Sequence, residues 1–146
     1  MSISGMAESY IRRAYANLDE ARRQKSLYCD KSVSASQECI EFSTKSIFLM
    51  LKGSHEPKHE ITDKEFQEIL SLIPSELSYI NFPRIWLLNK FWASFYLVAK
   101  YGDENLKVGA DKLFKEHEAE LALRHAEEAH SAAASLRNWL LTHKKS

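Results

Sequence analysis

The 146-residue chain carries 20 basic and 20 acidic side chains, so its formal net charge is zero. Proteins that bind nucleic acid tightly and without sequence preference usually carry a basic excess, and this balance argues against that class. A hydrophobic content of 45% with only four glycines and three prolines is typical of one compact helical domain, which we expect over residues 1–146.

The start of the chain and its cysteines favour a cytoplasmic protein. The sequence MSISGMAESYIRRAY lacks the apolar run of a secretion signal. Cys29 and Cys39 are too far apart for a disulfide if they share a continuous helix. We therefore expect free thiols in a reducing compartment.

Two long helices are predicted before residue 53. The first runs from about Ser4 to Gln24, where small and apolar residues recur at helical spacing. The second runs from about Asp30 to Lys52 and is closed by Gly53. The side chains expected to face the core are Ala7, Tyr10, Ile11, Ala14, Leu18 and Ala21 in the first helix, and Val33, Ile40, Thr44, Ile47, Phe48 and Leu51 in the second.

A loop and a short helix follow. The Gly and Pro content of residues 53–61 (GSHEPKHEI) predicts the loop. Thr62 and Glu65 then have the spacing of a capping box, in which each side chain bonds the backbone N–H of the other residue. This pattern predicts a short third helix with Phe66, Ile69, Leu70 and Ile73 on its apolar face.

The segment from Phe82 to Tyr101 (FPRIWLLNKFWASFYLVAKY) is expected as one continuous helix at the centre of the fold. Proline suits its first turn, and Gly102 supplies a stop. Its surface is apolar nearly all round, so neighbouring elements have to bury it on several sides. Polar residues interrupt the run and make it a poor membrane span; they are Asn89, Lys90 and Ser94.

A long last helix is predicted after a polar connection that ends at Asp111, a plausible N-cap. Its apolar face is rich in alanine, which lets another helix approach closely. This face and the excess apolar surface of residues 82–101 together predict a homodimer.

Five segments of the chain follow one another in a recognisable order: ANLDEAR (16–22), SQECIEFSTKSIFLMLKG (36–53), EPKH (56–59), KYG (100–102) and AELALRHAEEA (119–129). Together they resemble the HEPN (higher eukaryotes and prokaryotes nucleotide-binding) domain family. The resemblance implies an all-α, antiparallel up-and-down four-helix bundle with an additional short helix, often dimeric. Many members accompany a minimal nucleotidyltransferase in toxin–antitoxin pairs, and some are metal-independent endoribonucleases.

The nucleases of the family use an Arg followed, after four to six residues, by a His. Arg124, His125 and His130 satisfy this pattern formally. Arginine can stabilise charge on a phosphorane, and histidine can act as the base. In a continuous helix, however, Arg124 and His130 lie about 120° apart. We expect them not to form a working pair within one subunit; an endoribonuclease with a site formed across a dimer is the alternative.

The resemblance also makes four polar residues candidates for binding a nucleotide or a partner: Gln37, Glu41, Lys45 and His59. The first three repeat at four-residue steps and stack on one helix face, and Glu41 with Lys45 has the favourable order for an ion pair. His55 and His59 have the spacing of a zinc pair, but Pro57 disrupts a helix between them. We expect no metal and no cofactor. The predicted function is a non-catalytic module, of the kind found in toxin–antitoxin pairs, that binds a nucleotide, a nucleic acid such as RNA, or a nucleotidyltransferase-type partner.

Overall fold

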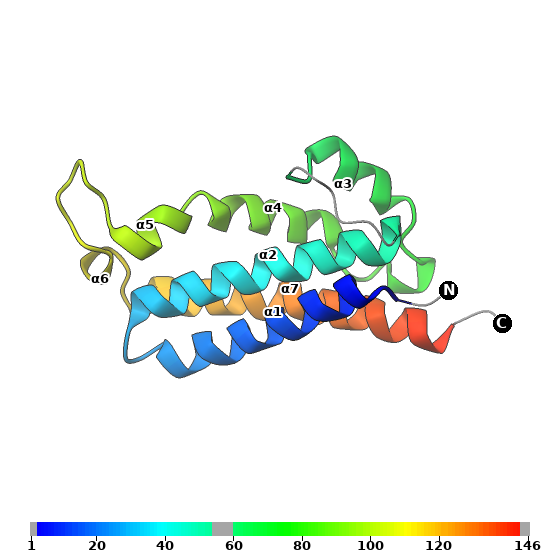
Figure 1. Cartoon of the computed structure of the whole chain (residues 1–146), viewed down its shortest axis with the longest axis horizontal. Coiled ribbons are helices and arrows are strands. Elements are labelled where there is room, and N and C mark those ends of the chain that lie inside the picture. Colours follow the sequence, from blue (N-terminus) through cyan, green and yellow to red (C-terminus); the bar gives the residue numbers. More distant parts are fainter. Residues whose placement is uncertain (1–2, 54–59, 144–146) are drawn as a thin grey trace.

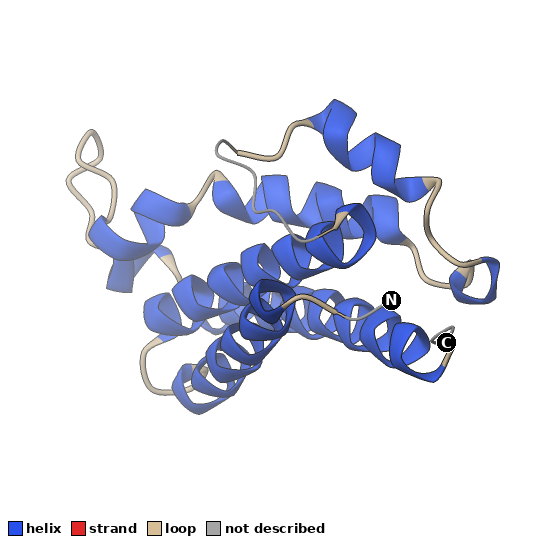
Figure 2. Cartoon of the chain, turned by 45° about the vertical axis from the view of Figure 1, so that its right-hand side comes forward, coloured by secondary structure: helices blue, strands red, loops and turns tan. Residues whose placement is uncertain are grey.

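The computed structural model describes residues 3–53 and 60–143. Within these ranges the chain forms helices joined by loops and a single isolated bridge between Asp103 and Val108, with no named strand, as Figure 2 shows. The elements are α1 (Gly5–Gln24), α2 (Cys29–Lys52), α3 (Asp63–Leu70), η1 (Ser75–Leu77), α4 (Phe82–Ala93), α5 (Tyr96–Tyr101), α6 (Ala110–Leu113) and α7 (Glu116–Thr142). None of the described helices is long and apolar enough to cross a membrane.

The predicted all-α bundle is confirmed. Figure 1 shows α1, α2, the α4–α5 pair and α7 running in alternating directions, so that the two ends of the chain lie at the same end of the bundle. The additional short helix is α3, which packs against α2 and α4. Thr62 and Glu65 form the expected capping box at its start, with the Thr62 backbone N–H donating to Glu65 Oε1 at 3.0 Å.

The centre of the bundle is α2, and the expectation that residues 82–101 would occupy it is wrong. Fourteen of the 24 residues of α2 are buried, whereas four of the 12 residues of α4 are buried. Many of the buried positions in α2 are small and polar. Several of their hydroxyls donate to backbone carbonyls; Thr44, for example, donates to the Ile40 carbonyl at 2.7 Å. Because these side chains are small, other helices can pack closely against several sides of α2.

Seams of small residues hold α1, α2 and α7 together. Ser32 and Ser46 of α2 donate to the carbonyls of Ala21 and Ala7 at 2.7 and 3.0 Å, which fixes the register of α1 on α2. The Cys39 thiol lies 3.7 Å from the Ala126 carbonyl of α7. Heptad-spaced alanines face these contacts and are fully buried: Ala7, Ala14 and Ala21 in α1, and Ala119, Ala126 and Ala133 in α7. Backbones that approach this closely leave no room for larger side chains.

The expected continuous helix over residues 82–101 is also wrong, because it breaks between Ala93 and Tyr96. The Ser94 hydroxyl donates to the Phe91 carbonyl at 2.6 Å, and the Phe95 N–H donates to the Trp92 carbonyl in a tighter turn. Phe95 also packs edge-on against Phe114, a buried residue in the connection between α6 and α7. A tertiary contact therefore ends α4, although neither Gly nor Pro is present.

The last helix begins five residues later than Asp111, at Glu116. Asp111 lies instead in the one-turn helix α6, after which Phe114 adopts an extended conformation and turns its ring into the core. The helix is then capped by Glu118, whose carboxylate accepts from the Lys115 N–H at 2.8 Å. Burial of Phe114 prevents an earlier start.

Candidate functional site

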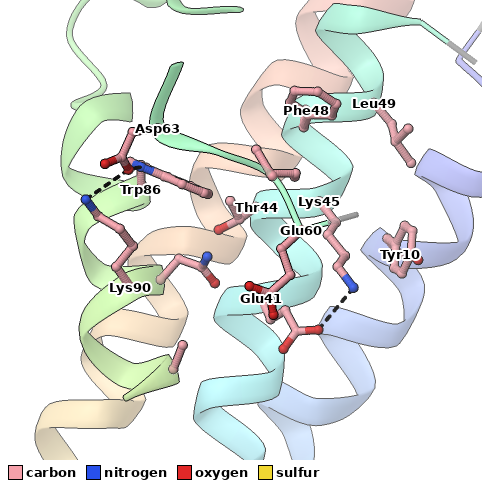
Figure 3. A pocket seen from close by; sticks show the side chains of 13 residues that line it. Tyr10, Glu41, Thr44, Lys45, Phe48, Leu49, Glu60, Asp63, Trp86 and Lys90 are labelled. Carbon is pink, nitrogen blue, oxygen red and sulfur yellow. Dashed lines mark hydrogen bonds and ion pairs between the residues drawn. The ribbon is translucent and has the colours of Figure 1, made fainter. Parts of the chain in front are cut away.

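A cleft with a volume of about 740 Å³ lies between α2 and α4, with α3 beside it. This volume is in the range of small-molecule sites. Figure 3 shows its side chains converging from several helices. It is lined by Tyr10, Glu41, Thr44, Lys45, Phe48, Leu49, Glu60, Ile61, Asp63, Trp86, Asn89, Lys90 and Ala93.

The α2 wall of the cleft contains two of the candidates from the sequence. Lys45 Nζ lies 3.1 Å from Glu41 Oε2, which confirms the expected ion pair. Behind them, Gln37 is only 4% exposed and donates from Nε2 to Glu41 Oε1 at 3.3 Å. The Gln37 Oε1 atom has no hydrogen-bond partner among the described residues. Gln37 thus supports Glu41 from the core, and His59, the fourth candidate, lies outside the described residues.

The opposite wall is organised around Asp63 at the start of α3. Its carboxylate accepts from the indole N–H of Trp86 at 2.7 Å and from Lys90 Nζ at 3.0 Å (Figure 3). These two donors, the indole first, lower the pKa of Asp63. The Trp86 ring stacks on Phe66 of α3, with ring centroids 4.8 Å apart. An aromatic face and an ammonium group are therefore held together at the cleft.

Another cation, Arg13, lies close to Tyr10, which is one of the residues that line the cleft. Tyr10 and Phe42 stack with ring centroids 5.5 Å apart. The Arg13 guanidinium lies 4.2 Å from the Phe42 centroid and 5.4 Å from that of Tyr10, while Lys45 Nζ is 5.5 Å from the Tyr10 centroid. No ion pair involving Arg13 is found within residues 3–53 and 60–143. Arg13 and Lys45 thus both lie beside the Tyr10 ring, and of these two cations Lys45 lines the cleft.

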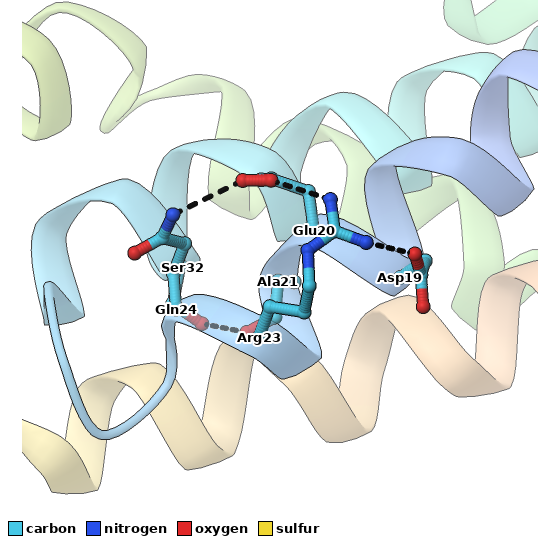
Figure 4. A network of polar contacts seen from close by, with 6 residues as sticks. All are labelled: Asp19, Glu20, Ala21, Arg23, Gln24 and Ser32. Carbon is cyan, nitrogen blue, oxygen red and sulfur yellow. Dashed lines mark hydrogen bonds and ion pairs between the residues drawn. The ribbon is translucent and has the colours of Figure 1, made fainter.

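Two further arginines of α1, Arg22 and Arg23, form ion pairs with carboxylates of the chain. Arg23 forms ion pairs with Asp19 and Glu20 along its own helix, and Gln24 completes this network through Glu20 (Figure 4). Arg22 pairs with Glu127 of α7 at 3.0 Å. Both guanidiniums therefore already have carboxylate partners and are poor candidates for a phosphate site.

The Arg and His residues of α7 point in different directions. The helix is continuous through all three, so Arg124 and His130 remain about 120° apart. His125 faces α4, where its Nδ1 accepts from the Trp92 indole at 2.9 Å. His130 faces α1 and packs against Tyr15, with ring centroids 5.7 Å apart. Arg124 is exposed. One subunit therefore does not bring Arg124 and His130 to a common point.

Burial also lowers the pKa values of both histidines. The pKa of His125 lies below its usual value of 6.5, because desolvation and the nearby Arg84 disfavour the charged ring. Desolvation and Arg22 lower the pKa of His130 in the same way. Both rings are therefore predominantly neutral at pH 7.

The bundle and the polar row on its central helix can be compared with known families. The model of the HEPN domain matches residues 7–136. The chain belongs to the HEPN domain family. The match includes all of α2 and the Arg and His residues of α7, and it confirms the resemblance seen in the sequence.

The fold of this HEPN domain is also similar to a solved structure. The crystal structure of TT1696 from Thermus thermophilus superposes with a TM-score of 0.65 and 21% identity, covering 89% of this chain and 97% of that chain. At this identity the similarity concerns the fold alone. Among curated proteins, no match is found.

Three cleft residues of the HEPN domain are not identified as site residues by the sequence patterns: Asp63, Trp86 and Lys90. Asp63 and Lys90 meet only because α3 folds back on α4, and their separation of 27 residues carries no recognisable pattern. The apolar pattern places Trp86 on a buried helix surface rather than at a cleft. The described residues contain no group of three or more His, Cys, Asp or Glu side chains arranged to hold a metal ion.

Proposed function

We propose that this HEPN domain is a non-catalytic module that binds a nucleotide in the cleft between α2 and α4. The observation that carries the proposal is the combination, in one cleft of about 740 Å³, of an aromatic face at Trp86 with cationic groups at Lys45 and Lys90. A nucleotide offers an aromatic base and an anionic phosphate, which suit these two kinds of group.

The charges favour a particular orientation of the ligand. Phosphate is expected at the end where Lys45 and Arg13 both lie beside the Tyr10 ring. The base is then expected towards Trp86, with Asn89 nearby as an amide donor and acceptor. Lys45 must leave Glu41 to bind phosphate, but an ion pair as exposed as this one stabilises the protein by less than about 1 kcal/mol. Moving Lys45 from Glu41 to a phosphate therefore costs little free energy.

The geometry of α7 supports binding without catalysis. The Nδ1 lone pair of His125 is occupied by the Trp92 indole, so this nitrogen is unavailable as a base. Arg124 and His130 lie on different sides of α7, and His130 packs against Tyr15. A nucleotidyltransferase-type partner and a role in a toxin–antitoxin pair remain predictions from the family; a shared nucleotide is a chemically reasonable link to such a partner.

Isothermal titration calorimetry with AMP tests the proposal. We expect binding to the wild-type protein and a loss of about tenfold or more in affinity for Lys45→Gln, because one charge-assisted contact contributes about 1.5–3 kcal/mol. Arg13→Gln should weaken AMP but leave adenosine unaffected. Lys112→Gln, an exposed change in α6, is the matched control. No binding of AMP at millimolar concentration, or equal affinities for Lys45→Gln and Lys112→Gln, would contradict the proposal.

A further inference from the structure

The side chains that line the cleft between α2 and α4 carry more negative than positive charge. Among the described lining residues, Glu41, Glu60 and Asp63 are acidic, and Lys45 and Lys90 are basic. Asp63 pairs with Lys90 and Glu41 with Lys45, whereas no ion pair of Glu60 is found within residues 3–53 and 60–143. A bare phosphate group would therefore enter a cleft whose lining has an excess of negative charge.

The Glu41 carboxylate lies where a bound phosphate would meet it. Lys45 Nζ is 3.1 Å from Glu41 Oε2, so a phosphate that takes Lys45 leaves Glu41 beside it without a counter-charge. Figure 3 shows Glu60, on the segment before α3, pointing towards Glu41 in the same cleft. Carboxylates and a phosphate that share a site repel one another. A divalent cation between Glu41 and the phosphate would remove this repulsion.

The core of the bundle holds Glu41 in a fixed orientation. Gln37 Nε2 donates to Glu41 Oε1 at 3.3 Å, whereas Lys45 approaches the other carboxylate oxygen. Gln37 is 4% exposed, and its Oε1 has no hydrogen-bond partner among the described residues. Carboxylates that bind metal ions are themselves held by hydrogen bonds from neighbouring polar groups. Gln37 is therefore a positioning residue that leaves Glu41 Oε2 directed at the cleft.

We propose that the cleft binds a nucleoside polyphosphate together with Mg²⁺, with Glu41 as the protein ligand of the ion; this inference rests on the proposed nucleotide function of the cleft. Mg²⁺ takes oxygen ligands, keeps several waters and is usually bound by one or two carboxylates plus the phosphates of a substrate. The ion arrives with the nucleotide, since the described residues contain no group of three or more His, Cys, Asp or Glu side chains that could hold a metal by themselves.

A chain of two or more phosphates also brings Arg13 into use. The Arg13 guanidinium is 5.4 Å from the Tyr10 centroid, and Lys45 Nζ is 5.5 Å from the same centroid. Phe42 stacks under the guanidinium at 4.2 Å, and Arg13 has no ion pair in the part of the chain that the structure describes. Guanidinium groups bind phosphate oxygens in pairs. Lys45 is thus placed for the inner phosphate and Arg13 for the terminal one.

Calorimetric titration of the full chain with ADP, in EDTA and in saturating Mg²⁺, tests the proposal. We expect Mg²⁺ to strengthen ADP binding by about tenfold or more, the effect of one charge-assisted contact. A site made of lysine and arginine alone predicts the opposite sign, because Mg²⁺ neutralises part of the phosphate charge. Mg²⁺ without nucleotide should not bind. Equal or weaker binding of ADP in Mg²⁺ would overturn the proposal, as would equally tight binding of Mg²⁺ alone.

Glu41→Gln should abolish the gain from Mg²⁺, although in EDTA it should bind AMP more tightly than the wild type does. The matched control is Glu20→Gln on α1, because Glu20 also pairs with a basic side chain, Arg23, and accepts from a glutamine, Gln24. This control should keep the full gain. A gain from Mg²⁺ that persists in folded Glu41→Gln would overturn the assignment of Glu41.

Two further variants test the positions of Gln37 and Arg13. Gln37→Leu should reduce the gain from Mg²⁺ while leaving the affinity for AMP in EDTA unchanged, which a general loss of structure would not do. Arg13→Gln should weaken the binding of ADP in Mg²⁺ more than it weakens that of AMP. Equal losses for ADP and AMP would exclude a contact between Arg13 and the terminal phosphate.

AMP in EDTA tests the nucleotide function separately, because it involves neither a second phosphate nor a metal ion. Binding of AMP and ADP without a gain from Mg²⁺ would overturn the present inference alone. Absence of binding by both ligands in EDTA and in Mg²⁺ would contradict the nucleotide function as well. The comparison of ADP in the two buffers uses the wild-type protein, so it decides the question even if circular dichroism shows that Glu41→Gln is unfolded.

Discussion

The indole N–H of Trp92 donates to Nδ1 of His125 across 2.9 Å and so joins α4 to α7. Trp92 is 3% exposed, and its ring also packs against Phe91 and Phe95 at the break between α4 and α5. The bond requires an unprotonated Nδ1 on His125. One contact therefore couples the position of the interrupted helix to the protonation state of a histidine on α7.

Two substitutions of Trp92 separate the contribution of its buried ring from that of its hydrogen bond to His125. Trp92→Ala is expected to lower the free energy of unfolding by about 3–5 kcal/mol, because it removes a buried aromatic ring. Trp92→Phe keeps most of the ring but leaves His125 Nδ1 without its donor, and should lower it by about 1–3 kcal/mol. Urea unfolding followed by circular dichroism measures both.

Trp139→Phe provides the matched control, since the buried Trp139 Nε1 has no hydrogen-bond partner among the described residues. It should change the free energy of unfolding by less than about 0.5 kcal/mol. A loss for Trp139→Phe equal to that for Trp92→Phe would show that the Trp92–His125 bond contributes nothing specific.

Stability should fall as the pH falls below about 6.5. The pKa values of His125 and His130 are lowered in the folded protein from the usual value of 6.5. The unfolded chain therefore binds protons first as the pH drops, and protonation favours unfolding. This stabilisation is complete above about pH 6.5 and is lost progressively as the pH falls towards the folded pKa values. Unfolding titrations at several pH values between about 8 and 5 measure the slope.

The double variant His125→Gln, His130→Gln should flatten this slope. Glu8 does not account for it, because the pKa of that carboxyl is lowered from 4.5 by the Arg137 hydrogen bond, and its contribution is lost only below that range. A slope that persists in the double variant between about pH 7 and 5 would refute the assignment to these two rings.

Glu41→Gln should strengthen AMP binding. The change removes the carboxylate that holds Lys45 at 3.1 Å and reduces the negative charge of the cleft. The release of one exposed ion pair predicts a gain of about two- to fivefold in affinity. Calorimetric titration at low and at physiological salt measures it, and the gain should shrink as salt increases. Weaker binding in Glu41→Gln would mean that Glu41 contacts the ligand directly.

The small-residue seams predict a position-specific penalty within α1. Ala14 is fully buried between helices, whereas Ala16 is exposed on the same helix. Ala14→Leu should lower the free energy of unfolding by about 1–3 kcal/mol through overpacking. Ala16→Leu, the matched change, should stay within about 0.5 kcal/mol of the wild type. Similar values for the two variants would mean that the helices are not closely packed at Ala14.

Arg124→Ala and His130→Ala test the alternative function. We expect no cleavage of single-stranded RNA above background in EDTA for the wild type, and none for either variant, because the two side chains lie on different sides of α7. Metal-independent cleavage by the wild type that disappears in both folded variants would establish an endoribonuclease.

The sequence predicted those parts of the fold that local patterns determine. The spacing of small and apolar residues located α1 and α2 to within about two residues, and the Thr62–Glu65 box located the start of α3. The i,i+4 order of Glu41 and Lys45 predicted their ion pair, which is part of the cleft. Each of these features depends on residues within one or two turns of one another.

Features that depend on tertiary contacts were not predictable in this way. The break at Ser94 needs Phe114 as a packing partner for Phe95, and these residues are far apart in the sequence. Burial of Ser32 and Ser46 in α2 depends on carbonyl acceptors in α1, so a hydropathy pattern places α2 nearer to the surface than it is. The Asp63–Lys90 side of the cleft likewise exists only once α3 lies against α4.

The two serine bonds between α2 and α1 have a mechanical consequence for the cleft. Ser32 and Ser46 fasten α1 at Ala21 and Ala7, two points about 21 Å apart along the helix. Two hydrogen bonds this far apart prevent α1 from sliding along α2 and from changing its angle to α2. Tyr10 and Arg13 lie between the two bonded positions. These two hydroxyl groups therefore fix the position of Tyr10, which lines the proposed nucleotide cleft, through bonds made within the chain alone.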